Sequence, residues 1–281
     1  MRAALGVLLA CGFALLVNAE TPAPVQRSKT VRVAVINGMM MTGLWQKITE
    51  MFETESGYKV EVAATGERPA LDSAFREGNI DLITMHSGDI TTTLVADGYA
   101  TNMRPWALNE LVIVGPKADP VGIRGMHDGA AALKKISTSG KFVDFNDIGS
   151  REVAQSLWQK AGLDPRGPWL MKDESEHKFQ ILQFARSKDA YVVVGRIPAL
   201  MGRMPNEGME ILVESDPAMR RPYIVMEANP KKIAGANVAG ARALADFLLS
   251  TKVQRFLSEF GSKEHGGLPL FYPVASSALN P

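Results

Sequence analysis

Along the first third of the chain, the spacing of hydrophobic positions switches repeatedly between the period of a strand and that of a helix. Short apolar runs rich in β-branched residues predict strands, and segments whose apolar side chains recur about every 3.6 residues predict helices. The expected elements, in chain order, are a strand at 31–36, a helix at 42–55, a strand at 58–63, a helix at 69–77 and a strand at 80–85. Such an order with short connections predicts a parallel sheet with right-handed crossovers.

The alternation continues to the end of the chain, so we expect an α/β fold throughout. The later strands are expected at 111–114, 142–145, 190–194 and 223–227, and the later helices at 126–139, 151–161, 179–186, 239–250 and 252–260. An α/β chain of about 260 residues can form one doubly wound domain or two lobes. The hydrophobic pattern does not choose between them.

The first nineteen residues have the features of an export signal. Arg2 precedes an apolar run at 3–17, and Ala19 is the small residue expected before a cleavage point. The run is about fifteen residues long, short of the roughly twenty that a membrane-spanning helix needs. Residues 20–30 then form a polar, proline-containing linker.

Cys11 is the single cysteine of the chain. It also fits, less well, a lipoprotein cleavage box, which would leave the protein anchored through an acylated Cys11. If the signal is removed instead, the mature chain has no thiol, which excludes disulfides, a thiolate nucleophile and a cysteine-ligated metal. An exported, unanchored protein is the favoured interpretation.

Composition and charge exclude several functional classes. Hydrophobic residues make up 46% of the chain, which fits a globular core, and 31 basic residues face 30 acidic ones. This balance does not favour nucleic-acid binding, which needs a clustered basic face. The chain lacks a Gly-x-Ser-x-Gly elbow, a His-Glu-x-x-His helix and a glycine-rich phosphate loop. We therefore predict neither a cofactor nor a metal site.

Candidate binding residues lie in polar loops next to the predicted strands, where ligands of α/β proteins bind. These residues are Asn37, Gly38, Met39 and Thr42 after the first strand, Thr65 and Arg68 after the second, Ser87 after the third, Ser150 and Arg151 after the strand at 142–145, and Arg196 after the strand at 190–194. The arginines can fork onto an oxyanion or a carboxylate. The hydroxyl residues also fit ordinary capping, and the methionine run at 39–41 fits either a pocket wall or core packing.

Several stretches resemble the periplasmic tungstate-binding proteins of ABC importers, relatives of the molybdate, sulfate and phosphate binders. The resemblance spans about 31–275, and its strongest parts are 98–123, which contains Asn-Glu-Leu-Val-Ile-Val-Gly-Pro, 229–250, which contains Ala-Asp-Phe-Leu-Leu-Ser, and 260–273. The resemblance implies a two-lobe type II periplasmic-binding-protein fold, each lobe a mostly parallel sheet flanked by helices. It places lobe 1 at 31–112 and 224–275 and lobe 2 at 113–223.

The candidate loops depart from that family. The family has a run of threonine and serine where this chain has Asn37-Gly38 and the methionines 39–41, and Phe145 stands near an expected arginine, whereas Arg196 is kept. A lost charge-assisted hydrogen bond costs roughly 1.5–3 kcal/mol, so an inorganic oxyanion would be held less well. The methionines instead fit a ligand with an apolar part and a carboxylate bound by Arg196 or Arg151.

We therefore expect a monomeric periplasmic solute-binding protein that captures a small anion by hinge closure and passes it to an ABC permease in the inner membrane. The anion is either tungstate-like or molybdate-like, or a small organic carboxylate. An exported sensor or accessory subunit with the same fold is a second hypothesis. An exported enzyme that uses Asp147 and His86 for acid–base catalysis is the least favoured one.

Overall fold

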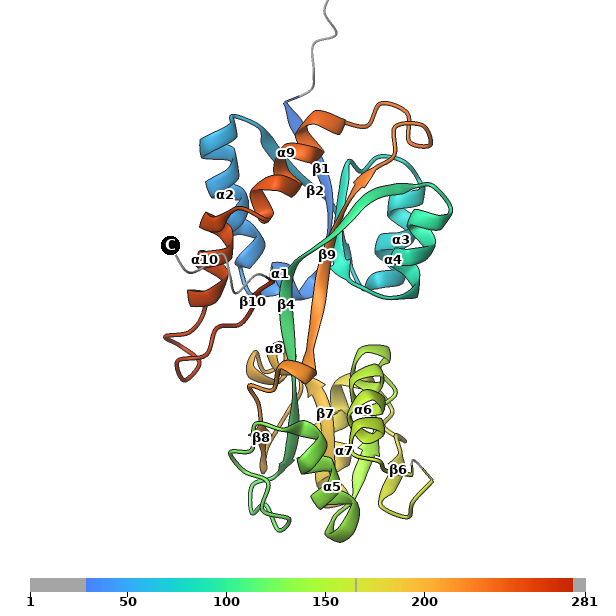
Figure 1. Cartoon of the computed structure of the whole chain (residues 1–281), viewed down its shortest axis with the longest axis vertical. Helices are drawn as coiled ribbons and strands as arrows, with labels where there is room; N and C mark the ends of the chain where they lie inside the picture. The colour runs from blue at the N-terminus through green and yellow to red at the C-terminus, as the bar shows by residue number, and fades with distance from the viewer. Residues whose placement is uncertain (1–28, 165, 275–281) are drawn as a thin grey trace, which may run out of the picture.

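The structure is a computed structural model that describes residues 29–164 and 166–274. The predicted signal, Cys11 and all but the last two residues of the predicted linker lie outside these residues. Figure 1 shows two lobes joined by two long strands, β4 (Ala100–Pro116) and β9 (Arg220–Ala228). The expected two-lobe arrangement is thus present, and β4 belongs to both lobes.

The first lobe contains a five-stranded sheet in the order β2-β1-β3-β9-β4. β1 (Thr30–Ile36) pairs in parallel with β2 (Lys59–Gly66) and β3 (Leu82–His86), which confirms the predicted parallel sheet. β9 runs antiparallel to both β3 and β4, and the short β10 (Tyr272–Pro273) adds to β4. The lobe is therefore a parallel unit extended by returning antiparallel strands.

Helices cover both faces of this sheet, which explains why β1 is apolar almost throughout. They are α1 (Asn37–Met41), α2 (Leu44–Ser56), α3 (Arg68–Arg76), α4 (Asp89–Ala96), α9 (Val238–Leu248) and α10 (Thr251–Glu259). Four of them match the sequence-based expectations to within about two residues at each end. α1 was expected as a loop, and α4 was not expected.

The second lobe is built on the far half of β4, with the order β4-β7-β5-β6 and β8 added to β4. β5 pairs in parallel with β6 and β7, and β7 is antiparallel to β4. The strands are β5 (Phe142–Asp144), β6 (Leu170–Lys172), β7 (Tyr191–Gly195) and β8 (Met209–Val213). The helices are α5 (Gly129–Ser139), α6 (Ile148–Lys160), η1 (Lys178–Gln180), α7 (Ile181–Ser187), α8 (Arg196–Leu200) and η2 (Pro217–Met219).

Two helix starts differ from expectation because aspartates cap them. Asp128 accepts a hydrogen bond from the Ala131 amide, so α5 begins at Gly129 rather than at 126. Asp147 accepts one from the Ser150 amide, so α6 begins three residues earlier than predicted. An N-cap side chain satisfies an otherwise unpaired amide of the first turn and so fixes where the helix begins.

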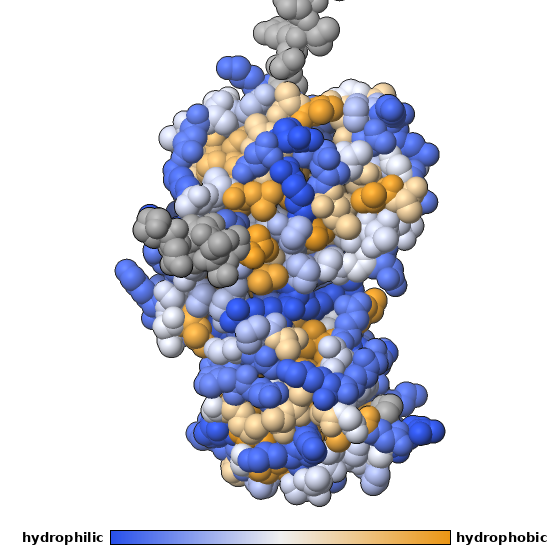
Figure 2. Space-filling view, viewed as in Figure 1, coloured by the Kyte–Doolittle hydropathy of each residue, from blue (hydrophilic) through white to orange (hydrophobic). Residues whose placement is uncertain are grey.

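Each lobe has its own hydrophobic core. The core of the first lobe gathers around Trp45 and Trp106. The second lobe has one cluster on each face of its sheet, one around Trp158 and the other containing Phe145. On the side shown in Figure 2, hydrophilic residues cover much of both lobes and gather at the waist between them. In the described part of the chain, no helix combines the length and apolar character needed to cross a bilayer.

The chain passes from one lobe to the other at a defined point of β4. Up to Glu110 this strand pairs with β9, and from Leu111 it pairs with β7. β9 carries the chain back and pairs with β4 of the first lobe from Arg220 onward. Two crossing strands between separate cores are the usual basis of a hinge.

Candidate functional site

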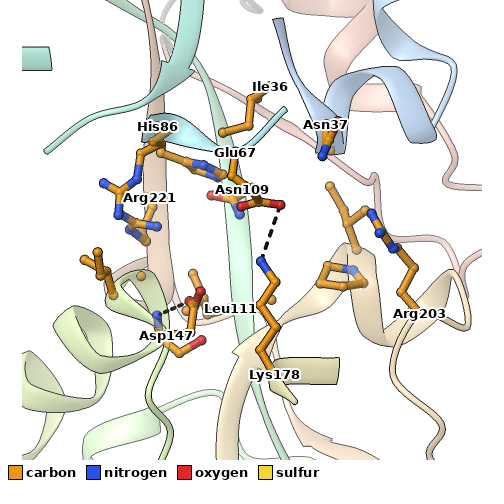
Figure 3. Close-up of a pocket in the computed structure, with 18 of the residues that line it drawn as sticks. Ile36, Asn37, Glu67, His86, Asn109, Leu111, Asp147, Lys178, Arg203 and Arg221 are labelled. Atoms are coloured by element: carbon orange, nitrogen blue, oxygen red, sulfur yellow. Dashed lines mark hydrogen bonds and ion pairs between the residues drawn. The ribbon is translucent and has the colours of Figure 1, made fainter. Parts of the chain in front are cut away.

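A cavity of about 230 Å³ lies between the lobes, where residues from both lobes and from the crossing strands line it (Figure 3). Drug-sized ligands occupy roughly 300–1,000 Å³, so this cavity suits a small ligand. Its polar lining is supplied by Asn37 and Gly38 of α1, Glu67 and Arg68 at the start of α3, His86 of β3, Asn109 of β4, Asp147 and Ser150 at the start of α6, Lys178 of η1, Arg203, and Arg221 and Tyr223 of β9.

Two arginines converge on one side of the cavity. Nη1 of Arg68 donates to the carbonyl oxygen of Ser87 at 3.4 Å, and Nη2 of Arg221 approaches the same oxygen at 3.5 Å. Arg221 also pairs with Glu152 at 2.8 Å, whereas Arg68 has no ion-pair partner among the residues described. Burial lowers the pKa of Arg221, and the nearby charge of Arg68 lowers it further, while Glu152 opposes the shift. The two cations make this side attractive to an anion.

Both guanidinium groups lie against glycine backbone. A β carbon at Gly88 would come within 2.6 Å of Nη1 of Arg68, and one at Gly149 would collide with Nη1 of Arg221. Gly88 also has a φ of +155°, a conformation that L side chains rarely adopt. The absence of side chains at these two positions therefore allows the arginines their observed positions.

His86 and Asn109 add neutral polar groups beside the arginines. The His86 ring stacks on Tyr223 with centroids 4.1 Å apart. Nε2 of His86 and Oδ1 of Asn109 are buried, and neither finds a hydrogen-bond partner within the described residues. Burial holds the pKa of His86 well below 6.5, and the charges of Arg221 and Arg68 act in the same direction. His86 is therefore neutral near pH 7.

The second lobe brings the N-terminus of α6 to the cavity. Gly149 and Ser150 of its first turn line the wall, with the capping Asp147 beside them. The first turn of a 13-residue helix carries unpaired amides and a partial positive charge. An anion between Arg68 and this turn would contact both lobes at once.

Further contacts bridge the lobes around the cavity. Lys178 of η1 pairs with Glu67, the N-cap of α3, at 3.4 Å (Figure 3). Nη1 of Arg203 lies 3.7 Å from Sδ of Met41, and its guanidinium stacks on the ring of Phe179 at 4.6 Å. These side chains meet across the gap and favour a closed arrangement of the lobes.

Four of the ten candidates from the sequence line the cavity: Asn37, Gly38, Arg68 and Ser150. The other loop candidates, Met39, Thr42, Thr65 and Ser87, lie behind the cavity lining. Met39 is fully buried in the first-lobe core, and Thr42 donates to backbone carbonyls of α1. Thr65 donates to Oδ1 of Asn37 at 3.1 Å, and Ser87 offers its carbonyl rather than its hydroxyl to the arginines. They position the loops that form the wall.

Arg196 and Arg151 lie outside the cavity lining, contrary to the expectation that one of them binds a carboxylate. Arg196 is 3% exposed and pairs with Glu214 at 2.9 Å, and its remaining nitrogens donate to the carbonyls of Pro269 and His265. Arg151 pairs with Asp144 at 3.1 Å. The guanidinium of Arg196 is engaged by groups of the protein itself, and Nε of Arg151 is engaged by Asp144. The arginines that line the cavity are Arg68, Arg203 and Arg221.

Several lining residues were missed from the sequence. Arg221 precedes the predicted strand at 223–227, whereas the structure places it in β9, which begins at Arg220. Asn109 precedes the predicted strand at 111–114, although a polar residue next to a buried strand was an available signal. Lys178 begins the short helix η1 and Arg203 lies in a loop, and the sequence carries no signal of the direction in which either side chain points.

The two lobes, the crossing strands and the cationic cavity between them define a protein that binds a small solute by enclosing it. The chain belongs to the bacterial extracellular solute-binding protein family, whose family model matches residues 31–263. It is 29% identical over 255 residues to the tungstate-binding protein TupA of Peptoclostridium acidaminophilum, a match that covers 89% of this chain and 88% of the relative.

Solved structures of tungstate-binding proteins have the same fold as this chain. The tungstate-binding protein TupA from Desulfovibrio alaskensis G20 superposes with a TM-score of 0.71 at 25% identity, covering 88% of this chain and 99% of that one. A tungstate ABC transporter structure from Geobacter sulfurreducens gives a TM-score of 0.67 at 26% identity, covering 82% and 98%. The expected type II periplasmic-binding-protein fold is thereby confirmed.

Proposed function

We propose that this protein is the extracytoplasmic solute-binding component of an ABC importer and captures a small oxyanion between its lobes. The observation that carries the proposal is the pair Arg68 and Arg221 inside a cavity that both lobes line. Relatives bear the names of tungstate-binding proteins, so tungstate and molybdate are the inorganic candidates. A small organic carboxylate is the alternative.

The mechanism is closure around the ligand, without a bond being broken. We place lobe 1 at 31–112 and 224–275 and lobe 2 at 113–223. The change of the pairing partner of β4 between Glu110 and Leu111, and the start of the β9–β4 pairing at Arg220, lie within about four residues of these bounds and support the division. An anion that contacts Arg68 of one lobe and the first turn of α6 of the other binds the closed form better than the open form. It therefore shifts the equilibrium toward closure by its difference in affinity.

Location and partner follow from the same proposal. The signal at 1–19 would direct the chain to the periplasm, where a monomer collects its ligand and presents it to a permease in the inner membrane. Anchoring through Cys11 is the alternative form of the same assignment. The proposal includes neither nucleic-acid binding nor catalysis, because the cavity chemistry supports holding an anion.

A thermal-shift screen of ligand-free protein tests the proposal. Tungstate, molybdate, sulfate, phosphate and small carboxylates are added in turn, and binding at 100 times Kd stabilises by about 2.7 kcal/mol. For a chain of this size that corresponds to a rise in Tm of roughly 5–10 °C.

Arg68→Gln should abolish the rise. Arg76→Gln, at the other end of α3 and paired with Asp72 and Asp97, should keep it. A wild-type protein whose Tm responds to none of these anions would contradict the proposal.

A further inference from the structure

The hydroxyl of Tyr223 is a polar group at the cavity that the protein itself leaves unsatisfied. The side chain is 1% exposed and lines the cavity. Within residues 29–164 and 166–274 its hydroxyl makes no hydrogen bond. By contrast, the buried hydroxyls of Tyr191 and Tyr272 donate to Asp119 and Glu110. An unsatisfied buried donor costs about 1–3 kcal/mol, and native proteins leave few of them, so a bound ligand is the partner that would satisfy this one.

Two neighbouring rings hold the ring of Tyr223 in place. His86 of β3 lies opposite Tyr223 of β9 in the sheet register, and the two rings stack with centroids 4.1 Å apart. The ring of Phe271 packs on Tyr223 at 5.8 Å. A side chain that is fixed by packing in this way loses little further freedom when its hydroxyl contacts a ligand.

Gly38 provides the space for the hydroxyl. A β carbon at this position would lie 3.3 Å from the hydroxyl oxygen of Tyr223, which is closer than such atoms usually approach. Gly38 belongs to α1 and lines the cavity. The hydroxyl therefore lies against the cavity wall that α1 forms, at the place where a side chain of residue 38 would project.

Tyr223 shares a sheet face with one of the two converging arginines. Alternate residues of a strand point to the same face, so Tyr223 and Arg221 of β9 lie on the same side of the sheet. Arg221 is in register with Asn109 of β4, and Figure 3 shows His86, Arg221 and Asn109 near one another on one side of the cavity. An oxyanion bound by Arg221 can therefore present another of its oxygens to Tyr223.

The hydroxyl of Tyr223 is protonated throughout the neutral range. Burial raises the pKa of Tyr223 well above its usual value, and the charge of Arg221 opposes the shift. A protonated hydroxyl can donate to an anion. Hydrogen bonds in which the acceptor is ionised are the stronger ones.

We infer that Tyr223 is a ligand-binding residue whose hydroxyl donates a hydrogen bond to an oxygen of the bound anion, and that Gly38 keeps the space this hydroxyl needs. The inference rests on the proposed function and adds a neutral donor to the arginines of the same site. Because the hydroxyl has no partner in the described part of the protein, its removal should affect ligand affinity and leave stability nearly unchanged.

Calorimetric titration of wild type and Tyr223→Phe with tungstate, molybdate and acetate tests the inference. The substitution removes one oxygen and keeps the ring between its neighbours. Affinity for the anions that wild type binds should fall roughly 10- to 150-fold, as expected for a lost hydrogen bond to a charged group. The Tm of the ligand-free variant should stay within about 3 °C of wild type.

Tyr191→Phe is the matched control with the opposite expectation. The hydroxyl of Tyr191 is buried in the second lobe, donates to Asp119 and accepts from the Val121 amide. Its removal leaves these partners unsatisfied, so the Tm should fall. Tyr191 does not belong to the cavity lining, and anion affinity should be kept.

Gly38→Ala is a second variant that keeps the hydroxyl and displaces it. Its β carbon would press on the hydroxyl oxygen of Tyr223, so anion affinity should fall at least about twofold. In the Tyr223→Phe background the oxygen is absent, and Gly38→Ala should cause no further loss.

The outcomes are distinct. A loss of affinity in Tyr223→Phe at nearly unchanged Tm supports the inference. Equal affinity in wild type and Tyr223→Phe overturns it and leaves the proposed function standing. A wild-type protein that binds none of the three anions overturns the inference and the proposed function together. If Tyr223→Phe does not fold, Gly38→Ala decides: a fall in affinity supports the inference, and unchanged affinity overturns it.

Discussion

Glu67 and Lys178 form a 3.4 Å ion pair that joins the start of α3 in the first lobe to η1 in the second. Both side chains are substantially exposed, at 58% and 38%. Exposed pairs contribute about 0–1 kcal/mol, so this pair biases the lobes toward closure without locking them. A weak bridge suits a protein that must open again to release its ligand.

Breaking that bridge should weaken ligand binding modestly. Lys178→Gln is expected to lower the affinity for whichever anion binds by about fivefold at most, because the closed form loses part of its stability relative to the open form. The effect should shrink as salt is raised. Calorimetry measures the change, and Lys160→Gln, at the distant end of α6, is the control. A loss of a hundredfold would mean that Lys178 contacts the ligand directly.

Gly149→Ala should impair binding more than stability. Alanine is favourable within a helix, but its β carbon would collide with Nη1 of Arg221 and force that guanidinium away from the cavity. We expect at least a tenfold loss of anion affinity and a shift in Tm of only a few degrees. Gln155→Ala, on an exposed part of the same helix, should change neither. Unaltered affinity in Gly149→Ala would remove Arg221 from the proposed site.

Acid should destabilise the ligand-free protein through His86. Its pKa is well below 6.5 in the folded state, chiefly because of burial and then because of Arg221 and Arg68. Below pH 6.5 the unfolded chain binds a proton that the folded chain does not, so the free energy of unfolding falls with falling pH. A single such group contributes up to about 1.36 kcal/mol per pH unit, down to the pKa of the folded state.

Urea unfolding at pH 7.5 and pH 5.5 measures this contribution. Wild type should lose more stability between the two values than His86→Gln does. The pH 7.5 comparison corrects for packing lost in the variant, since the imidazole is neutral there in both states. Equal losses in the two proteins would show that His86 does not carry the effect. A bound anion offsets the two arginines and should reduce the loss.

Arg196→Met should destabilise the protein and leave ligand affinity in place. Its removal takes away the ion-pair partner of Glu110, which is 1% exposed, and leaves the Ser215 amide and the Tyr272 hydroxyl as hydrogen-bond donors to that carboxylate. Breaking a buried pair costs about 3–5 kcal/mol, or roughly 6–20 °C in Tm. Thermal unfolding measures the loss of stability, and calorimetry at low temperature measures the ligand affinity. A variant that remains stable but no longer binds the anion would indicate that Arg196 belongs to the binding site.

The parallel part of the first lobe was predictable because its strands are short segments rich in β-branched and apolar residues, and each has a glycine at its end or within two residues of it. The length of β4 was not predictable. Its polar Asn109 and Glu110 interrupt the pattern at the crossing point, where Glu110 accepts hydrogen bonds from the Ser215 amide and from Tyr272. Those partners lie more than a hundred residues away in the chain, so local periodicity could not identify them.

Part of the cavity lining was predicted from the sequence. Four of the ten candidates in loops next to strands line the cavity, and they are Asn37, Gly38, Arg68 and Ser150. Arg196 follows a predicted strand, and whether it faces the cavity depends on which carboxylates it reaches in the folded protein. An arginine after a strand has the same local sequence signal whether it faces a cleft or a buried glutamate.

The pairing of Arg221 with Glu152 has a consequence for how the empty protein meets its ligand. Arg221 pairs in register with Asn109 on the first-lobe side of the crossing strands, and Glu152 belongs to α6 of the second lobe, so separating the lobes draws the carboxylate away from the guanidinium. The unoccupied, parted form then presents more positive potential to solvent than the shut form does. Association with anions is therefore faster for the form with separated lobes. After the lobes close, Glu152 partly cancels the attraction of Arg221.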